Sequence, residues 1–207
     1  MHDNTRDSAG FPEAVKDACG VGLLADIQGR PSHALLAQAL DALARMAHRG
    51  AIDADGRTGD GAGVMTQIPF ALLRPLAEAM GLVCAPDELA VGLVFLPRGD
   101  VASEAARRMV ELTLKHHGLP GCRWRAVPID EVALGRTALQ SRPAIAHALV
   151  PRPRDLLPAE FETRLIAARR AIELRAHYYA GDHSIPDASV SSTESGKAST
   201  VIGWMAP

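Results

Sequence analysis

The chain has 207 residues, of which 47% are hydrophobic and 22% charged, and its formal net charge is −2. This composition is typical of a globular protein with a sizeable core, and the length predicts one domain or a domain plus an extension. The near-neutral charge argues against a nucleic-acid-binding or polybasic membrane-binding surface. No apolar stretch reaches the roughly 18 residues that a membrane-spanning helix needs.

The three cysteines, Cys19, Cys84 and Cys122, are scattered along the chain. They lack the paired spacing of a zinc site or a disulfide framework, so no metal site is expected, and a reducing cytoplasm fits them best. Cys84 and Cys122 are expected to be ordinary, partly buried thiols. The first 18 residues are polar and charged and lack the apolar core of a secretory signal.

The first third of the chain is expected to alternate strands and helices. Residues 19–27 are short and apolar, which is typical of a buried strand. Ser32 is a candidate N-cap for a helix that runs to about His48, and Gly50 would end this helix. A loop at 51–61, a strand at 62–68 and a short helix with Pro75 at 70–80 are expected to follow.

The middle of the chain has stronger patterns. The apolar run at 89–96 predicts a buried strand. A helix is expected at about 101–117, with an inward face formed by Val101, Ala105, Met109 and Leu112. Further strands are expected at 122–129 and 143–150. The stretch from about 89 to 150 therefore predicts a compact α+β subunit.

The last part of the chain contains one clear helix and one short strand. The helix is expected at about 159–177, with Phe161, Leu165, Ala168 and Ile172 facing inward. Residues 182–200 are rich in Ser, Thr, Gly and Asp, which is typical of a loop. Residues 201–205 are a candidate strand.

Cys19 is the main candidate for a catalytic residue. It heads an apolar run after the polar leader, and Gly20 leaves space beside its sulfur. If the leader were removed, its thiol could act as nucleophile with its own α-amino group as the base. Residues 1–18 would then be a propeptide. The alternative is a cysteine that simply belongs to the core, as free cysteines commonly do.

Arg49 and Gly50 follow the first helix. An arginine at a helix end can complement the helix dipole and stay solvated. Alternatively, its planar guanidinium could face a substrate carboxylate or brace the cysteine loop.

The loop Thr58-Gly59-Asp60-Gly61-Ala62-Gly63 is the third candidate part of the site. It lacks the Lys-Ser/Thr of a nucleotide-binding P-loop and leads into an expected strand. A turn that permits close backbone packing near Cys19 is the favoured interpretation of Gly59, Asp60 and Gly61.

Taken together, these segments resemble the start of the glutamate synthase large subunit. The segments that carry the resemblance are Asp17–Gly22, Gly29–His33, Ala39–Leu43, His48–Ala51 and Thr58–Gly63. The resemblance is dense over residues 13–69 and collinear through about 190. That region of the family is a class II glutamine amidotransferase domain, of the N-terminal-nucleophile type.

The resemblance implies a fold, an activity and a nucleophile. The fold is a four-layer αββα sandwich, of which this chain would hold a part at about 19–181, followed by an irregular segment at 182–207. The propeptide would end at Ala18, and Cys19 would form a γ-glutamyl thioester with the substrate glutamine and release ammonia, with Arg49 near the nucleophile. FMN and an iron–sulfur cluster are implied only for the full parent enzyme of glutamate biosynthesis and nitrogen assimilation, so no cofactor is expected here. The expected partners are the other glutamate synthase domains or a small subunit.

The chain also departs from the family pattern. The only asparagine is Asn4, in the presumed leader, so no residue can take the part of the oxyanion-binding asparagine that the resemblance implies. The segment Ser189–Thr193 lacks the arginine of the family's stretch. The sequence therefore predicts a truncated glutaminase domain with little or no activity alone. The alternatives are a partner-binding module or a non-functional gene remnant.

Overall fold

The computed structural model describes residues 20–85, 88–179 and 202–205, and side chains up to Ala176. The chain divides into two compact units, Met1–Val64 and Met65–Pro207, and each unit is described by itself. Cys19 and the segment 182–200 lie outside the described residues, and so do the expected propeptide and Ser189–Thr193.

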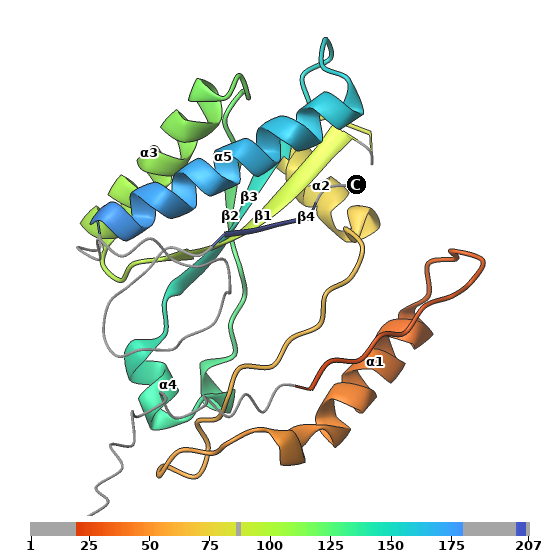
Figure 1. Ribbon diagram of the computed structural model, residues 1–207, viewed down its shortest axis with the longest axis vertical. Helices are drawn as coiled ribbons and strands as arrows, with labels where there is room; N and C mark the ends of the chain where they lie inside the picture. Colours follow the sequence, from red (N-terminus) through yellow and green to blue (C-terminus); the bar gives the residue numbers. More distant parts are fainter. Residues whose placement is uncertain (1–19, 86–87, 180–201, 206–207) are drawn as a thin grey trace, which may run out of the picture. The chain divides into compact units, whose positions relative to one another are not determined.

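The first unit is built around one helix, α1 (His33–Arg45) (Figure 1). The Ser32 side chain accepts a hydrogen bond from the Leu35 N–H at 3.3 Å, which confirms the predicted N-cap. The helix ends at Arg45, and a separate 3₁₀ turn, η1 (Ala47–Arg49), precedes Gly50. Gly50 therefore ends this turn and not the α-helix, and its φ of −96° is extended, so the predicted helix cap at Gly50 was wrong.

Two predicted strands of the first third are also wrong. The described residues 20–27 and the segment 62–68 have no strand assignment, although both are apolar enough for one. A strand needs a hydrogen-bonded neighbour, and neither segment pairs with a ladder in the part of the chain that is described. The side chains of Val21, Leu23 and Met65 are accordingly exposed.

The second unit contains an antiparallel sheet. Its described strands are β1 (Leu89–Leu96), β2 (Arg123–Ala126), β3 (Ala144–Pro151) and β4 (Ile202–Met205), in the order β2-β3-β1-β4. The register pairs Val94 with Ala146 and, on the other side of β1, with Ile202. The strands predicted at 89–96, 122–129, 143–150 and 201–205 are confirmed. Strand β4 is a further member of the sheet in the subunit predicted at 89–150. The second unit is therefore of the α+β class.

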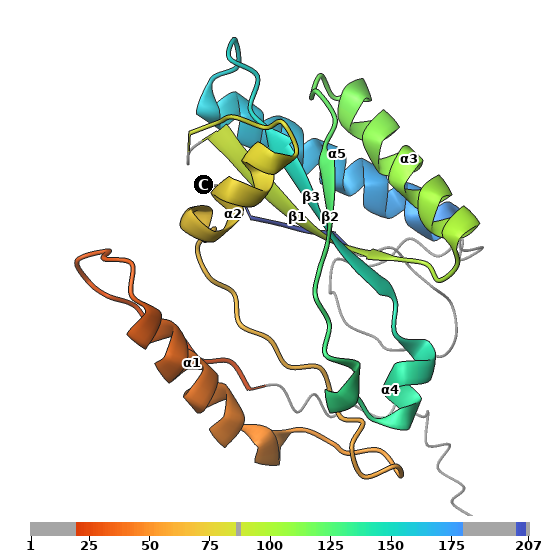
Figure 2. The same cartoon turned by 180° about the vertical axis from the view of Figure 1, so that it is seen from behind.

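Helices cover both faces of this sheet. Helices α3 (Asp100–His116) and α5 (Pro158–Tyr179) lie side by side over one face (Figure 1), and α2 (Phe70–Ala79) lies on the other (Figure 2). The alternation of side chains along a strand divides the core accordingly. Val94 and Leu96 pack toward α3 and α5, whereas Leu89 and Val91 pack toward α2. The short elements η3 (Glu131–Ala133) and α4 (Arg136–Ser141) connect β2 to β3.

The predicted helices differ in how well their inward faces were identified. The face of α5 is confirmed, because Phe161, Leu165, Ala168 and Ile172 are all buried. The predicted face of α3 was wrong: Val101, Ala105 and Leu112 are exposed and only Met109 is partly buried, whereas the buried residues are Val110, Thr113 and Leu114. None of the described helices is both long and apolar enough to cross a membrane.

Candidate active site

The structure describes the surroundings of Cys19 from Gly20 onward. Around Gly20, a Cβ atom would lie 3.2 Å from the Met46 sulfur and 3.9 and 4.0 Å from Cγ and Cβ of Arg49. The backbone directly after Cys19 therefore lies close to the aliphatic part of the Arg49 side chain. Arg49 thus lies beside Gly20, the first described residue after Cys19, and Met46 is a neighbour that the sequence did not single out.

Arg49 is held by the 3₁₀ turn. Its N–H donates to the Met46 carbonyl at 2.8 Å, and the Gly50 N–H donates to the Ala47 carbonyl at 3.2 Å. The guanidinium is exposed, and it can present its five N–H donors to a carboxylate or to a carbonyl oxygen.

The loop after Gly50 folds back on itself as a small hairpin. Ile52 and Gly59 form an antiparallel bridge, and the Asp53 N–H donates to the Thr58 carbonyl at 2.7 Å. At the tip, the Asp55 carboxylate accepts hydrogen bonds from the backbone N–H groups of Arg57 and Thr58 and from the Thr58 hydroxyl. The hairpin brings Gly59 and Asp60 back to the chain that follows Arg49.

Asp60 closes this hairpin at its base. Its Oδ2 accepts a hydrogen bond from the Ala51 N–H at 2.8 Å, and its own N–H donates to the Ala51 carbonyl at 3.2 Å. A Cβ atom on Gly59 would approach the Ala51 carbonyl to 3.1 Å, so Gly59 packs closely against Ala51, while the predicted packing near Cys19 lies outside the described residues. Around Gly61 a Cβ atom would meet nothing within 4 Å, so no such packing exists there.

The other two cysteines lie in the second unit. Cys122 is buried, and burial, followed by the charge of Glu111, raises the pKa of its thiol to about 12. Cys84 is partly buried, and burial raises its pKa as well. The thiolate is the reactive form of cysteine, so neither residue is suited to nucleophilic attack near neutral pH. Both are ordinary, partly or fully buried thiols, as the sequence predicted.

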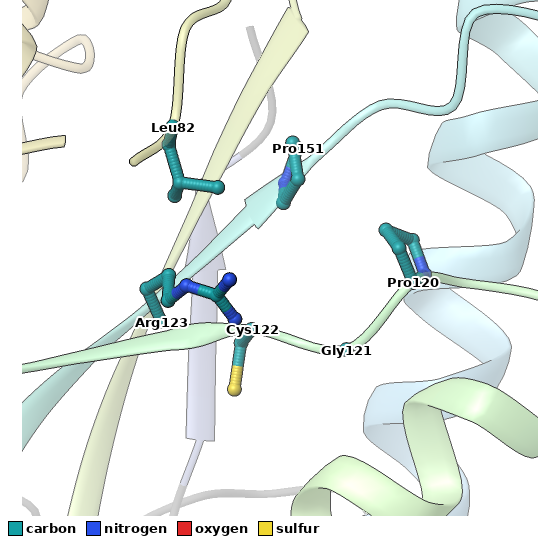
Figure 3. Close-up of a pocket in the computed structure, with 6 residues that line it drawn as sticks. All are labelled: Leu82, Pro120, Gly121, Cys122, Arg123 and Pro151. Carbon is teal, nitrogen blue, oxygen red and sulfur yellow. The ribbon is translucent and has the colours of Figure 1, made fainter. Parts of the chain in front are cut away.

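A small pocket lies at the end of the sheet in the second unit. It is lined by Leu82, Pro120, Gly121, Cys122, Arg123 and Pro151 (Figure 3). The Cys122 sulfur points away from Leu82 and Pro151, toward the core between the sheet and helices α3 and α5.

The described residues do not fit an iron–sulfur cluster. Such a cluster is held by several cysteine thiolates in one place, whereas Cys84 and Cys122 belong to different hydrophobic clusters. Among the residues that the structure describes, no group of three or more His, Cys, Asp or Glu side chains could hold a metal ion.

The sequence model of the glutamine amidotransferases class-II matches residues 19–195, which is most of the chain. The chain belongs to this family. Its match begins at Cys19.

Curated relatives identify a narrower group of similar proteins. The chain is 43% identical over 158 residues to ferredoxin-dependent glutamate synthase 2 of Synechocystis sp., and 39% identical over 170 residues to the glutamate synthase [NADPH] large chain of Azospirillum brasilense. These matches cover 76% and 82% of this chain but only 10% and 11% of the relatives. The glutamate synthase [NADH] of Schizosaccharomyces pombe is 40% identical over 141 residues, which cover 67% of this chain and 7% of that protein. The chain thus spans about a tenth of the length of these relatives.

Proposed function

We propose that this chain carries the nucleophile of a glutaminase, Cys19, and acts in hydrolysing glutamine to glutamate and ammonia. The observation that carries the proposal is the closeness of the Arg49 side chain to Gly20, the residue after Cys19, in a chain of the class II glutamine amidotransferase family. The start of the family match at residue 19 supports an N-terminal cysteine, with residues 1–18 as a propeptide.

The proposed reaction has two covalent steps. After the Ala18–Cys19 bond is hydrolysed, the free α-amino group of Cys19, with an ordinary pKa near 8, takes the thiol proton. The thiolate attacks the side-chain amide carbon of glutamine, and the C–N bond breaks as ammonia leaves with that proton. Water then attacks the γ-glutamyl thioester and the C–S bond breaks. Glutamate is released, and the free thiol is restored.

Arg49 and Gly50 are proposed to bind substrate or to brace this site. The contacts of Gly20 with the Arg49 stem and the Met46 sulfur leave the guanidinium at the far end of the side chain, where it is exposed. A guanidinium in this position can bind a substrate carboxylate and also favours the thiolate form of a nearby cysteine.

The sheet of the second unit supports a four-layer αββα fold. On the face opposite α3 and α5, helix α2 buries Leu89 and Val91, but Leu93 and Phe95 at the other end of β1 remain only partly buried. Their neighbours Val94 and Leu96 on the covered face are fully buried. We propose that a second sheet covers this open half, in a domain of residues 19–181 followed by an additional segment at 182–207.

The proposed partners follow from the relatives. Their names describe glutamate synthases that use ferredoxin, NADPH or NADH. We propose that the ammonia made at Cys19 serves such a synthase in the cytoplasm, with FMN and iron–sulfur chemistry supplied by other parts of the enzyme or by a small subunit.

Ammonia release from glutamine tests whether these 207 residues form the whole site. The 207 residues contain one asparagine, Asn4, so the oxyanion-binding asparagine that the resemblance implies is missing between residues 19 and 207. The loss of one such donor lowers the rate about 100- to 1,000-fold. We therefore expect ammonia release by the purified chain to stay close to that of Cys19→Ala. A rate well above that control would show that the 207 residues form a complete site.

A second candidate function is a partner-binding module, and the partly open face at Leu93 and Phe95 favours it. In this case residues 1–18 would remain attached in a stable chain. A glutaminase domain is distinguished from it by the N-terminus: a mature protein that begins at Cys19 supports the first function, and an intact leader supports the second.

A further inference from the structure

We propose that Asp60 is a positioning residue, which holds Arg49 beside Gly20, the residue after Cys19, through the backbone of Ala51. This inference rests on the proposed function of Cys19 and Arg49. It assigns to the Asp60 carboxylate a task in the first unit that is separate from binding glutamine.

Asp60 binds Ala51 through two hydrogen bonds of opposite direction. The carboxylate accepts the Ala51 N–H at 2.8 Å, and the Asp60 N–H donates to the Ala51 carbonyl at 3.2 Å. Both groups of the Ala51 backbone are therefore bound by one residue. Ala51 lies only two positions after Arg49, so its orientation limits the directions that the Arg49 backbone can take.

The 3₁₀ turn fixes the chain on the other side of Arg49. The N–H groups of Arg49 and Gly50 donate to Met46 and Ala47. A Cβ atom on Gly50 would lie 3.9 Å from both Cβ and Oδ2 of Asp60, so Gly50 itself lies close to the aspartate. Arg49 is thus held between the turn before it and the Asp60 hairpin after it, while its stem contacts Gly20.

To bind the Ala51 N–H, residue 60 needs a hydrogen-bond acceptor but not a negative charge. This requirement distinguishes a positioning role from the role of a base or of a group that binds an ammonium ion. An asparagine oxygen can accept the Ala51 N–H in the same place. A carboxylate that acted as a base, or that bound an ammonium group of the substrate, could not be replaced by a neutral amide. Asp60→Asn is therefore expected to preserve the positioning, and Asp60→Ala to remove it.

The reactivity of Cys19 provides a readout that needs no glutamine. A nearby guanidinium lowers the pKa of a thiol, and alkylation by iodoacetamide requires the thiolate. Below the thiol pKa, each unit of upward shift lowers the thiolate fraction about tenfold. We expect Asp60→Ala and Arg49→Met to slow the alkylation of Cys19 near pH 7 about threefold or more, and to shift its pH profile upward.

The experiment measures the alkylation rate of Cys19 against pH by peptide mass spectrometry on the full chain. Asp60→Asn and the control Asp53→Ala are expected to keep the wild-type profile. Asp53 lies in the same hairpin, and its carboxylate accepts only the neighbouring Ala54 N–H among the contacts described for it. Asp60→Glu keeps the charge but lengthens the side chain, so it is expected to shift the profile as Asp60→Ala does. Circular dichroism confirms that each variant retains its helices.

The outcomes separate this inference from the proposed function. A shifted profile in Arg49→Met with an unchanged profile in Asp60→Ala and Asp60→Glu would overturn the role of Asp60 and leave that of Arg49. An unchanged profile in Arg49→Met would overturn the role of Arg49 itself. If Asp60→Asn shifted the profile while Asp60→Glu did not, the charge of Asp60 would be its contribution, and the positioning role would be wrong.

Discussion

The side chain of Arg49 occupies the space beside Gly20, within 3.9 Å of the position that a Cβ atom on this glycine would take. The Met46 sulfur lies closer still, at 3.2 Å. A Cβ atom at residue 20 would press on the Met46 sulfur and come into ordinary van der Waals contact with the Arg49 stem. Gly20 thus leaves room for both neighbours, and a side chain larger than alanine there would crowd them.

We predict that Gly20→Val slows the alkylation of Cys19 near pH 7 several-fold, because the valine crowds the Met46 sulfur and the Arg49 stem and so shifts the guanidinium that we propose favours the thiolate. Gly22→Val is the matched control, since a Cβ atom there would meet nothing within 4 Å. Equal rates in the two variants would show that the space beside Gly20 is unimportant.

Two leucines of α3 test the corrected inward face of this helix. Leu114 is fully buried, whereas Leu112 is 63% exposed. Leu114→Ala is expected to lower the free energy of unfolding by about 2–5 kcal/mol, and Leu112→Ala by less than about 0.5 kcal/mol. Urea denaturation measures both. A larger loss of stability in Leu112→Ala than in Leu114→Ala would support the inward face predicted from the sequence.

Two glycines end their helices in the same way and differ in one neighbour. Gly81 follows α2 and Gly118 follows α3, with φ of +76° and +71°, and in each case the next N–H bonds to a carbonyl five residues earlier. A Cβ atom on Gly118 would overlap the Arg164 guanidinium, whereas Gly81 has open space.

We therefore expect Gly81→Ala to cost about 1–2 kcal/mol of stability from backbone strain alone, and Gly118→Ala to cost more. Denaturation midpoints of the two variants, and of Gly118→Ala combined with Arg164→Ala, provide the measurement. The double variant should lose only as much stability as Gly81→Ala. A larger loss would mean that Arg164 does not cause the extra destabilisation in Gly118→Ala.

His147 gives the stability a dependence on pH. Partial burial, followed by the positive charge of Arg125, lowers its pKa below 6.5 in the folded protein. Between pH 6.5 and that lower value, the unfolded chain binds the proton more readily than the folded one. Stability is therefore lost as the pH falls through this range, and the contribution of His147 is fully present above it.

The variant His147→Gln should lose less stability than the wild type between about pH 7.5 and about pH 5.5, because it removes this titration. His116→Gln, at the exposed end of α3, serves as the control. Urea unfolding at both pH values tests the expectation, which fails if His147→Gln and the wild type show the same pH dependence.

The elements that were predicted correctly are those whose own residue pattern is enough to specify a strand or a helix. The continuous apolar run of β1 and the periodic face of α5 required no knowledge of their partners. The face of α3 was misplaced because Thr113, a polar residue, is buried there: its hydroxyl donates to the Met109 carbonyl and accepts from Arg175. The hydrogen bond from Arg175 on the other helix gives the buried Thr113 hydroxyl a partner, so this polar residue can lie in the core. A pattern of apolar residues cannot predict such a buried polar position.

The site was predicted in part for a similar reason. The motifs identified Arg49 and the Gly59–Gly61 loop, since these residues resemble a family pattern. The bond between Asp60 and Ala51 could not be predicted, because it depends on how the intervening hairpin closes. Residues 20–27 show the opposite case: their composition suits a strand, but only a neighbouring strand could make them one.

The mass of the protein recovered from cells tests the central proposal most directly. If Cys19 is an N-terminal nucleophile that takes part in its own release, the wild-type chain will lose residues 1–18 and begin at Cys19, whereas Cys19→Ala will keep its leader. Intact-mass spectrometry of both proteins, with sequencing of the N-terminus, distinguishes the outcomes. A wild-type chain that retains the Ala18–Cys19 bond would contradict the account.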